Sequence, residues 1–451
     1  MAIKAEEIIA EMHKNYENGQ EGSVPPNARH YGAAIASIAR SGHRDAAKLS
    51  KALLKRLLIS YYETKDATLL PDHYMFCEVM NAIGRDKRES LNKALKIQNL
   101  LRNLIDLHEE TGHERLVPNE AVFQSAISAI ASIRDDDYAI GVMEEIVDEM
   151  RSSSLRPNEQ LMTTMIHCYG NYNQPEAAEA VLKEMGAVYA SSGEERFRPN
   201  KSSYNSAIRA WARAGNADRC KALLDEMLEK YASGNEAVKP DSMTFVSVIN
   251  SLWKSGAPNA SEAAIEMLRL MEDKYANGDA DFAPTADVYY SVINAIARSD
   301  LSDKAVKAKE ILERAKREGK LDVYLLTGVL NACAYTKSSS INDQQAALAI
   351  AQEVEAELHN NPSIRLDSIV CNTLLLVYSY LVTDKRERDM LSSRLFKQCC
   401  EKGLVSTPFL GNLRRFAPSV YEQSIGDNIR FRDLPSEWTR NAKKLKNNNR
   451  R

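Results

Sequence analysis

Apolar residues recur along this chain at the spacing of paired amphipathic helices, and the segment 201–241 shows the pattern most completely. A first helix is predicted from four residues that fall on one helical face: Tyr204, Ala207, Ile208 and Trp211. Gly215 ends that helix, and a second stripe follows before a loop at 231–239: Cys220, Leu223, Leu224 and Met227. Two such helices cannot bury their apolar faces alone, so the pattern predicts packing against further pairs.

The stripe of the second helix returns along the chain as a small residue followed by apolar residues three, four and seven positions later. It recurs at Ala178, Val181, Leu182 and Met185, at Ala264, Met267, Leu268 and Met271, at Ala308, Ile311, Leu312 and Ala315, and at Ala347, Ile350, Ala351 and Val354. One such stripe is common in surface helices, whereas recurrence at a fixed interval is typical of stacked helix pairs. The sequence therefore predicts an all-α solenoid of antiparallel helix pairs.

Nine units of about 42 residues are predicted at 28–72, 73–119, 120–158, 159–200, 201–241, 242–285, 286–322, 323–367 and 368–406. Residues 1–27 match only the second helix of a unit, from which we expect a sequence that lacks its true N-terminus. Residues 407–436 are expected to cap the stack. Residues 437–451 are expected to be a disordered basic tail, with Arg440, Lys443, Lys444, Lys446, Arg450 and Arg451.

Several units end in a proline followed by Asp or Asn, as at Pro199-Asn200 and Pro240-Asp241. Proline disfavours helix at the residue before it, and Asp or Asn accepts hydrogen bonds from the first turn of the next helix. The simplest interpretation of these acids and amides is therefore a helix N-cap.

Composition limits the partners that this chain can have. A net charge of −3 and a pI near 6.3 exclude a surface that is basic throughout, but they allow a basic stripe on one face. The seven cysteines lack paired-ligand spacing, so reduced thiols are expected. No apolar run approaches the ~20 residues that cross a bilayer, so we expect no membrane partner.

Motifs for catalysis are weak. His108 and His113 lie five residues apart, whereas zinc-binding histidines on one helical face lie four apart. A run of three aspartates, 135–137, falls at a turn between helices, where solvated acids are expected. We therefore expect a protein that is not an enzyme, with no cofactor, no metal and no small-molecule substrate.

A cation recurs at the thirteenth residue of five units, near the end of the first helix: Arg40, Arg85, Arg213, Lys254 and Arg298. Stacked units would align these side chains along one edge, as contacts to backbone phosphates require. A cation at this position also complements the carbonyl end of a helix dipole. Both interpretations stay open from the sequence.

The chain resembles the pentatricopeptide repeat family in the run Tyr204-Asn205-Ser206-Ala207-Ile208, in the turn at Ala214-Gly215 and in the terminal Pro240-Asp241. The resemblance implies a right-handed superhelix that binds single-stranded RNA, one nucleotide per repeat. The units exceed the family's usual ~35 residues, and the excess is expected in loops such as 189–197 and 275–282.

In that family the fifth and the last residue of a unit face the base. The pairs that fit are Thr163 with Asn200 for adenine, Asn205 with Asp241 for uracil, Thr327 with Asp367 for guanine, and Asn372 with Ser406 for cytosine. The other five units do not fit this code: Gly32 with Asp72, Cys77 with Asn119, Gln124 with Asn158, Val246 with Thr285, and Tyr290 with Asp322. These five are expected to bind without discrimination, to stack a base on Tyr290, or to act as spacers.

The resemblance implies a non-catalytic RNA-binding protein that acts in RNA processing, stability or translation in a mitochondrion or plastid, alongside other RNA-processing proteins. One alternative is a protein-binding scaffold. Another is the targeting arm of a nuclease whose catalytic domain lies outside this chain.

Overall fold

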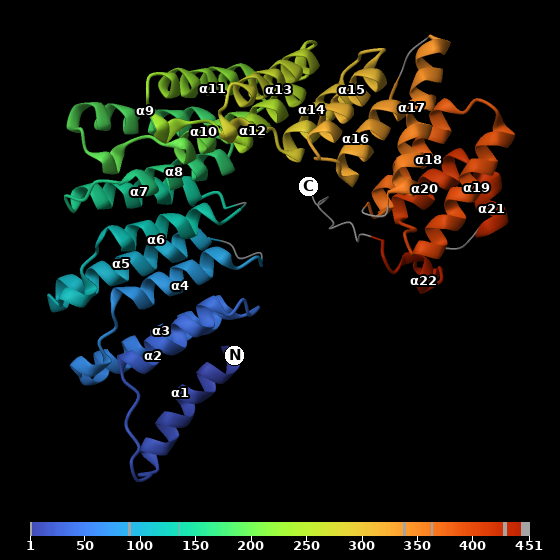
Figure 1. Cartoon of the computed structure of the whole chain (residues 1–451). Coiled ribbons are helices and arrows are strands. Elements are labelled where there is room, and N and C mark those ends of the chain that lie inside the picture. Colours follow the sequence, from blue (N-terminus) through green and yellow to red (C-terminus); the bar gives the residue numbers. More distant parts are fainter. Residues whose placement is uncertain are drawn as a thin grey trace. The chain divides into compact units, whose positions relative to one another are not determined.

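The computed structural model describes residues 2–88, 92–134, 136–336, 340–361, 364–426 and 431–442, and within these ranges it is helical with no strand (Figure 1). The chain forms two compact units. The N-terminal unit comprises Met1–Ala214 with Glu229–Lys239, and the C-terminal unit comprises Gly215–Leu228 with Pro240–Arg451. The helical repeats confirm the prediction of an all-α solenoid of stacked helix pairs.

The first helices of the repeats form one layer in each unit. In the N-terminal unit they are α2 (Ala28–Arg40), α4 (His73–Arg85), α6 (Glu120–Ala131), α8 (Glu159–Asn171) and α10 (Lys201–Arg213). In the C-terminal unit they are α12 (Ser242–Ser255), α14 (Ala286–Arg298), α16 (Val323–Ala334), α18 (Ser368–Leu381) and α20 (Thr407–Phe416). Each first helix packs on the next one within its unit.

The second helices pack against the first helices with their apolar stripes. In chain order they are α3 (Ala46–Thr64), α5 (Lys93–Thr111), α7 (Ala139–Ser152), α9 (Pro175–Ser192), α13 (Ala260–Ala276), α15 (Lys304–Arg317), α17 (Ile341–Asn360) and α19 (Lys385–Lys402). Helix α11 (Ala217–Ala232) contains residues of both units. Helix α1 (Ala2–Glu17) precedes them and packs on α2 through the buried Ile9. The core of each unit lies between the two layers.

The first helices begin at side-chain caps, as the Pro-Asp and Pro-Asn pairs indicate. Asp72 Oδ1 accepts from Met75 N at 3.0 Å, and Asp322 Oδ1 accepts from Leu325 N at 2.8 Å. The same kind of cap starts α2, α6, α8, α10, α12, α18 and α20, whereas Thr285 makes no side-chain cap for α14. The capping interpretation is thus confirmed for these residues.

Close contacts between first helices depend on small residues. A Cβ on Gly84 of α4 would lie 2.5 Å from the backbone oxygen of Ala129 in α6. A Cβ on Gly170 of α8 would lie 2.9 Å from Cβ of Ala210 in α10. Since real Cβ atoms do not approach that closely, glycine at these positions sets the spacing of the layer.

The loops predicted at 189–197 and 275–282 lie after the second helices, but they begin later than predicted. Helix α9 continues to Ser192 and α13 to Ala276. Short 3₁₀ turns then follow, including η3 (Glu195–Phe197) and η5 (Ala280–Phe282). Phe197 and Phe282 of these turns are buried and fix the connector to the core.

The prediction of solvated aspartates at 135–137 is also wrong for the middle residue, while Asp135 lies outside the described residues. Asp136 is buried, and its Oδ2 accepts from Ala94 N at 3.0 Å. It therefore caps α5 of the preceding repeat, which explains why a buried carboxylate is tolerated here.

The C-terminal end of the stack is covered by short elements. Helices α21 (Pro418–Ser424) and α22 (Ser436–Thr439) follow α20, and the Trp438 ring lies edge-on to Phe396 with centroids 5.6 Å apart. The basic tail residues Lys443, Lys444, Lys446, Arg450 and Arg451 lie outside the described residues. All seven cysteines are free thiols, six of them buried. None of the described helices combines the length and hydropathy needed to span a bilayer.

Candidate nucleic-acid interface

One predicted base-reading pair meets on a shared carboxylate. Thr163 Oγ1 donates to Glu159 Oε1 at 3.1 Å, and Asn200 Nδ2 donates to the same oxygen at 2.8 Å. Asn200 Oδ1 meanwhile caps α10 by accepting from Ser202 N and Ser203 N. The structure therefore brings the fifth and the last residue of this unit together at the start of two neighbouring first helices.

The pair Asn205 and Asp241 falls on two different units of the chain. Asn205 belongs to the N-terminal unit and is only 9% exposed. Asp241 belongs to the C-terminal unit, where its Oδ1 accepts from Thr244 N at 3.0 Å and caps α12.

The two remaining pairs lie in the C-terminal unit. Thr327 is 8% exposed, and its Oγ1 donates to the carbonyl oxygen of Val323 at 2.6 Å. Asp367 caps α18 and Ser406 caps α20, while Asn372 Oδ1 accepts from Asn412 Nδ2 at 2.8 Å. All four predicted last residues are therefore N-caps in the structure, and the caps use the side-chain oxygen.

Gln124 belongs to a unit that does not fit the base-reading code, and its hydrogen bonds could not be predicted from the sequence. Its Nε2 donates to Ser128 Oγ and to Thr164 Oγ1, both at 3.1 Å. Its Oε1 is buried without a hydrogen-bond partner among the described residues. An acceptor that is buried and unpaired costs stability, so Gln124 weakens the packing at this position.

Sequence reasoning also missed a set of exposed apolar side chains. They stand at the second residue of four units, in the first turn of the first helix: Tyr74, Met243, Tyr324 and Ile369. Tyr324 touches the predicted stacking residue Tyr290, with ring centroids 6.1 Å apart. Their recurrence at the second position of the unit could have predicted them from the sequence. They place apolar surface beside the base-reading positions.

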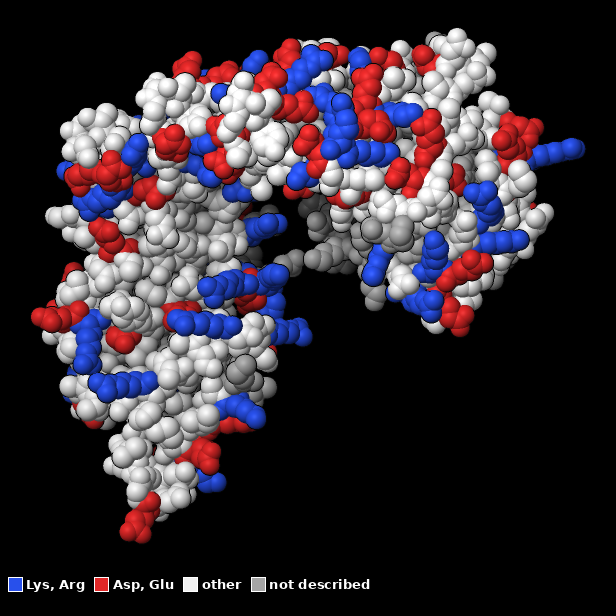
Figure 2. Space-filling model, viewed as in Figure 1, with Lys and Arg blue, Asp and Glu red and all other residues white. Residues whose placement is uncertain are grey.

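The predicted cations of the thirteenth position lie at the ends of the first helices. Arg213 donates to Asn171, the thirteenth residue of the preceding unit, so consecutive positions of this edge are in contact. Lys254 Nζ and the Arg298 guanidinium lie 5.7 and 4.2 Å from the centre of the Trp253 ring. Figure 2 shows Lys and Arg side chains along the corresponding edge of the N-terminal unit. We call these ends of the first helices the thirteenth-position edge.

Most of these cations lack an acidic partner. Arg40 pairs with Glu78 of the next repeat, although its side chain stays 68% exposed. Across the described ranges, no carboxylate pairs with Arg85, Arg213, Lys254 or Arg298. Their charge is therefore available to a bound anion as well as to the helix dipole.

Positive charge is crowded where α8 meets α10. Burial lowers the pKa of His167, and the nearby Arg209 and Arg213 lower it further. Burial also lowers the pKa of Arg213, with added repulsion from Arg209 and Arg134. Perturbed groups of one sign in one place are typical of sites that bind the opposite charge.

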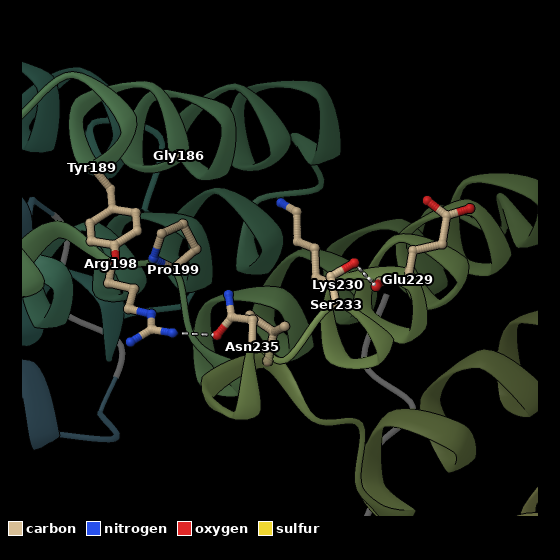
Figure 3. A pocket seen from close by; sticks show the side chains of 9 residues that line it. Gly186, Tyr189, Arg198, Pro199, Glu229, Lys230, Ser233 and Asn235 are labelled. Atoms are coloured by element: carbon tan, nitrogen blue, oxygen red, sulfur yellow. Dashed lines mark hydrogen bonds between the residues drawn. The ribbon is translucent and has the colours of Figure 1, made fainter. Parts of the chain in front are cut away.

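A pocket on the second-helix side offers a weaker candidate (Figure 3). It is lined by Gly186, Tyr189, Arg198, Pro199, Glu229, Lys230, Ser233, Asn235 and Val238. Arg198 Nη2 donates to Asn235 Oδ1 at 2.7 Å, and Ser233 Oγ donates to the carbonyl oxygen of Glu229 at 2.9 Å. These side chains hold the connector in place by pairing with one another. No group of three or more His, Cys, Asp or Glu side chains among the described residues is placed to hold a metal ion.

The geometry defines an all-α helical-repeat protein with a cationic edge on its first-helix layer. The model of the pentatricopeptide repeat matches residues 161–187 and 202–231, so these two segments are similar to pentatricopeptide repeats and the predicted resemblance is confirmed. No curated protein matches the sequence.

Several solved structures are similar to this chain, including the following three. The pentatricopeptide repeat protein PPR10 in complex with an 18-nucleotide psaJ RNA element is 13% identical over 92% of this chain, with a TM-score of 0.40. The chain spans 58% of the length of that protein. PPR10 from maize is 16% identical, with 93% and 67% of the two chains covered and a TM-score of 0.35. An engineered protein is 14% identical, with 92% and 98% covered and a TM-score of 0.39.

Proposed function

We propose that this protein binds single-stranded RNA along its first-helix layer. The observation that carries the proposal is the edge of cations that the protein's own carboxylates leave unneutralised, above all Arg213, which lies close to Arg209. Phosphates spaced along a strand are the ligand that such an edge fits, because each neutralises one cation of a repeated series.

The base-reading positions support the same ligand. Amide side chains such as Asn200 and Asn205 both donate and accept, while Asp241 and Asp367 carry carboxylates that only accept. An acceptor suits the ring N–H of uracil or guanine, and an amide suits adenine. The proposed readers are Thr163, Asn200, Asn205, Asp241, Thr327, Asp367, Asn372 and Ser406, and the proposed phosphate contacts are Arg40, Arg85, Arg213, Lys254 and Arg298.

The protein acts without chemistry of its own in this proposal. It covers a segment of a transcript and thereby blocks a nuclease, keeps a site unfolded, or presents the RNA to a processing enzyme. The family is largely organellar, so we place this activity in a mitochondrion or plastid. Other RNA-processing proteins are the expected partners.

A salt titration of RNA binding tests the proposal. If all five thirteenth-position cations meet phosphates, the logarithm of the binding constant falls against the logarithm of salt with a slope of roughly −3.5, at about −0.7 per contact. Duplex RNA of the same length serves as the control, because its paired bases cannot reach the readers. Weak retention that does not depend on salt would contradict RNA binding and favour the protein-binding scaffold.

The base-reading assignment is tested by selection of RNA from a random pool with the Asp367→Asn variant. Asn caps a helix as well as Asp, so α18 keeps its start while the carboxylate becomes an amide. We expect preference to change from guanine to adenine at one nucleotide only. An unchanged preference would contradict the reader role of Asp367, and a preference lost at all positions would contradict reading by single repeats.

A further inference from the structure

The thirteenth-position edge changes character within the C-terminal unit. Lys254 and Arg298 occupy this position in α12 and α14, whereas the next two repeats carry Tyr335 and Tyr380. These tyrosines are 42% and 45% exposed. Phe416, the last residue of α20, is the tenth residue of its segment and contacts Tyr380 at the end of this edge.

The three rings form a continuous row. The centroids of Tyr335 and Tyr380 lie 6.1 Å apart with the planes tilted by 47°. Those of Tyr380 and Phe416 lie 5.3 Å apart with the planes near perpendicular at 76°. Rings that meet at such angles are not stacked face to face, and both tyrosines stay exposed. A core contact would have buried them.

Cations stand at both ends of this row. Arg298 lies on the preceding first helix, α14, next to the α16 that leads to Tyr335. At the other end the Arg415 guanidinium lies 5.0 Å from the centre of the Phe416 ring. An aromatic surface bounded by positive charge fits a ligand that is both anionic and aromatic. A protein helix with an apolar face would not need the flanking cations.

We propose that Tyr335, Tyr380 and Phe416 are a stacking platform for bases of single-stranded RNA, an inference that rests on the proposed function. The strand follows the cations of α12 and α14 through its phosphates and then turns its bases onto the rings. Every base has an aromatic face, so the platform binds without sequence preference. It adds affinity where Tyr335 and Tyr380 replace the cations.

The contributions of the cations and of the rings to RNA affinity depend differently on salt. The cations release counterions when phosphates bind, whereas stacking on a ring neutralises no charge. Loss of the rings therefore lowers affinity without changing the slope against salt. Loss of Arg298 lowers the affinity and also reduces the slope against salt.

The experiment measures binding of single-stranded RNA to the full chain with Tyr335→Ala and Tyr380→Ala combined. We expect affinity to fall about tenfold for each ring with an unchanged salt slope. The double Tyr→Phe variant keeps the rings and should keep the affinity. Tyr275→Ala is the matched control, since Tyr275 is also 42% exposed but lies on the second helix α13. It should bind as the original chain does.

Photo-crosslinking gives a second reading that does not depend on the stability of the alanine variants. RNA carrying 5-iodouridine should crosslink to Tyr335 or Tyr380 of the original chain, and peptide mapping identifies the residue. Crosslinks confined to other segments, equal affinity of the double alanine variant, or loss of affinity in the double phenylalanine variant would each overturn the platform. If the original chain binds no RNA at all, the proposed function itself fails. If the original chain binds RNA and the tyrosine variants bind it with the same affinity, only the proposed platform fails.

Discussion

The two helical layers of each unit differ in how their charged side chains are paired. Neighbouring second helices are joined by ion pairs across repeats: Lys65–Glu110, Arg102–Glu145, Arg151–Glu184, Lys307–Glu262, Arg314–Glu272, Lys309–Glu353, Lys316–Glu357 and Arg394–Glu355. On the thirteenth-position edge of the first helices, Arg40–Glu78 is the comparable pair among the described residues. Surface pairs add little stability, but they leave no charge for a polyanion.

The layers also differ in how their helices start. Side-chain caps begin most first helices, whereas α3, α7, α9, α13 and α15 start without one. The cap residue fixes where each of these first helices begins, and it is the last residue of a unit, which is one of the two base-reading positions. The net charge of −3 for the whole chain does not reveal this difference between the layers. Many of the acidic residues lie on the second helices, where they form ion pairs.

The largest expected effect concerns the packing of the first helices. Gly84→Ala should lower the free energy of unfolding by about 2 kcal/mol, because its Cβ would meet the Ala129 backbone. Gly186→Ala in the second helix α9 is the matched control. Its Cβ would lie 4.0 Å from Pro199, so we expect a gain of about 0.5–1 kcal/mol from helix propensity. Urea unfolding followed by circular dichroism measures both. Equal effects would contradict the difference in packing.

A smaller effect is expected at the helix starts. Asp322→Ala removes the cap of α16 and should lower the free energy of unfolding by about 1 kcal/mol, whereas Asp322→Asn should leave it unchanged. Asp303→Ala at the start of α15 is the control, since Asp303 makes no side-chain cap there. Thermal unfolding of the three variants checks this. A larger loss at Asp303 would refute the distinction.

The smallest effect concerns pH and His167. The pKa of His167 is lowered from 6.5 by burial and by Arg209 and Arg213. A phosphate bound there offsets both arginines and raises this pKa, so binding takes up a proton. RNA affinity should therefore rise a few-fold as pH falls from above 6.5 to below it. His167→Gln should remove this rise. The same dependence in the variant would show that other groups cause it.

The stability of the free protein depends on pH in the opposite direction to RNA affinity. The folded pKa of His167 lies below the unfolded value, so the unfolded chain binds more protons as pH falls. This residue therefore contributes stability above pH 6.5 that is lost as the pH decreases.

The sequence predicts the helix starts well because the information is local. A proline before Asp72 or Asn200 bars helix, and the next side chain caps it, all within four residues. The start of the loop after α9 was predicted too early, because the helix continues through Gly186 and ends only at Gly193. The burial of Phe197, which holds the connector, becomes visible only when the repeats are packed.

The site is predictable in position but not in electrostatics. The thirteenth residue of each unit is read from the repeat, so Arg213 and Arg298 could be named. Their lack of acidic partners depends on residues about one repeat away, as does the burial of Asp136 against Ala94. The crowding of His167 by Arg209 likewise needs two helices placed side by side.

The most direct test compares the two layers in one binding measurement. Arg85→Ala with Arg213→Ala removes two proposed phosphate contacts of the first-helix layer, and Arg102→Ala with Arg151→Ala removes two cations that are paired on the second-helix layer. At about 1 kcal/mol per phosphate contact, the first variant should bind single-stranded RNA about 30-fold more weakly. Its salt slope should shrink by about 1.4. The second variant should match the original chain, and equal losses in the two variants would contradict an RNA site on the first-helix layer.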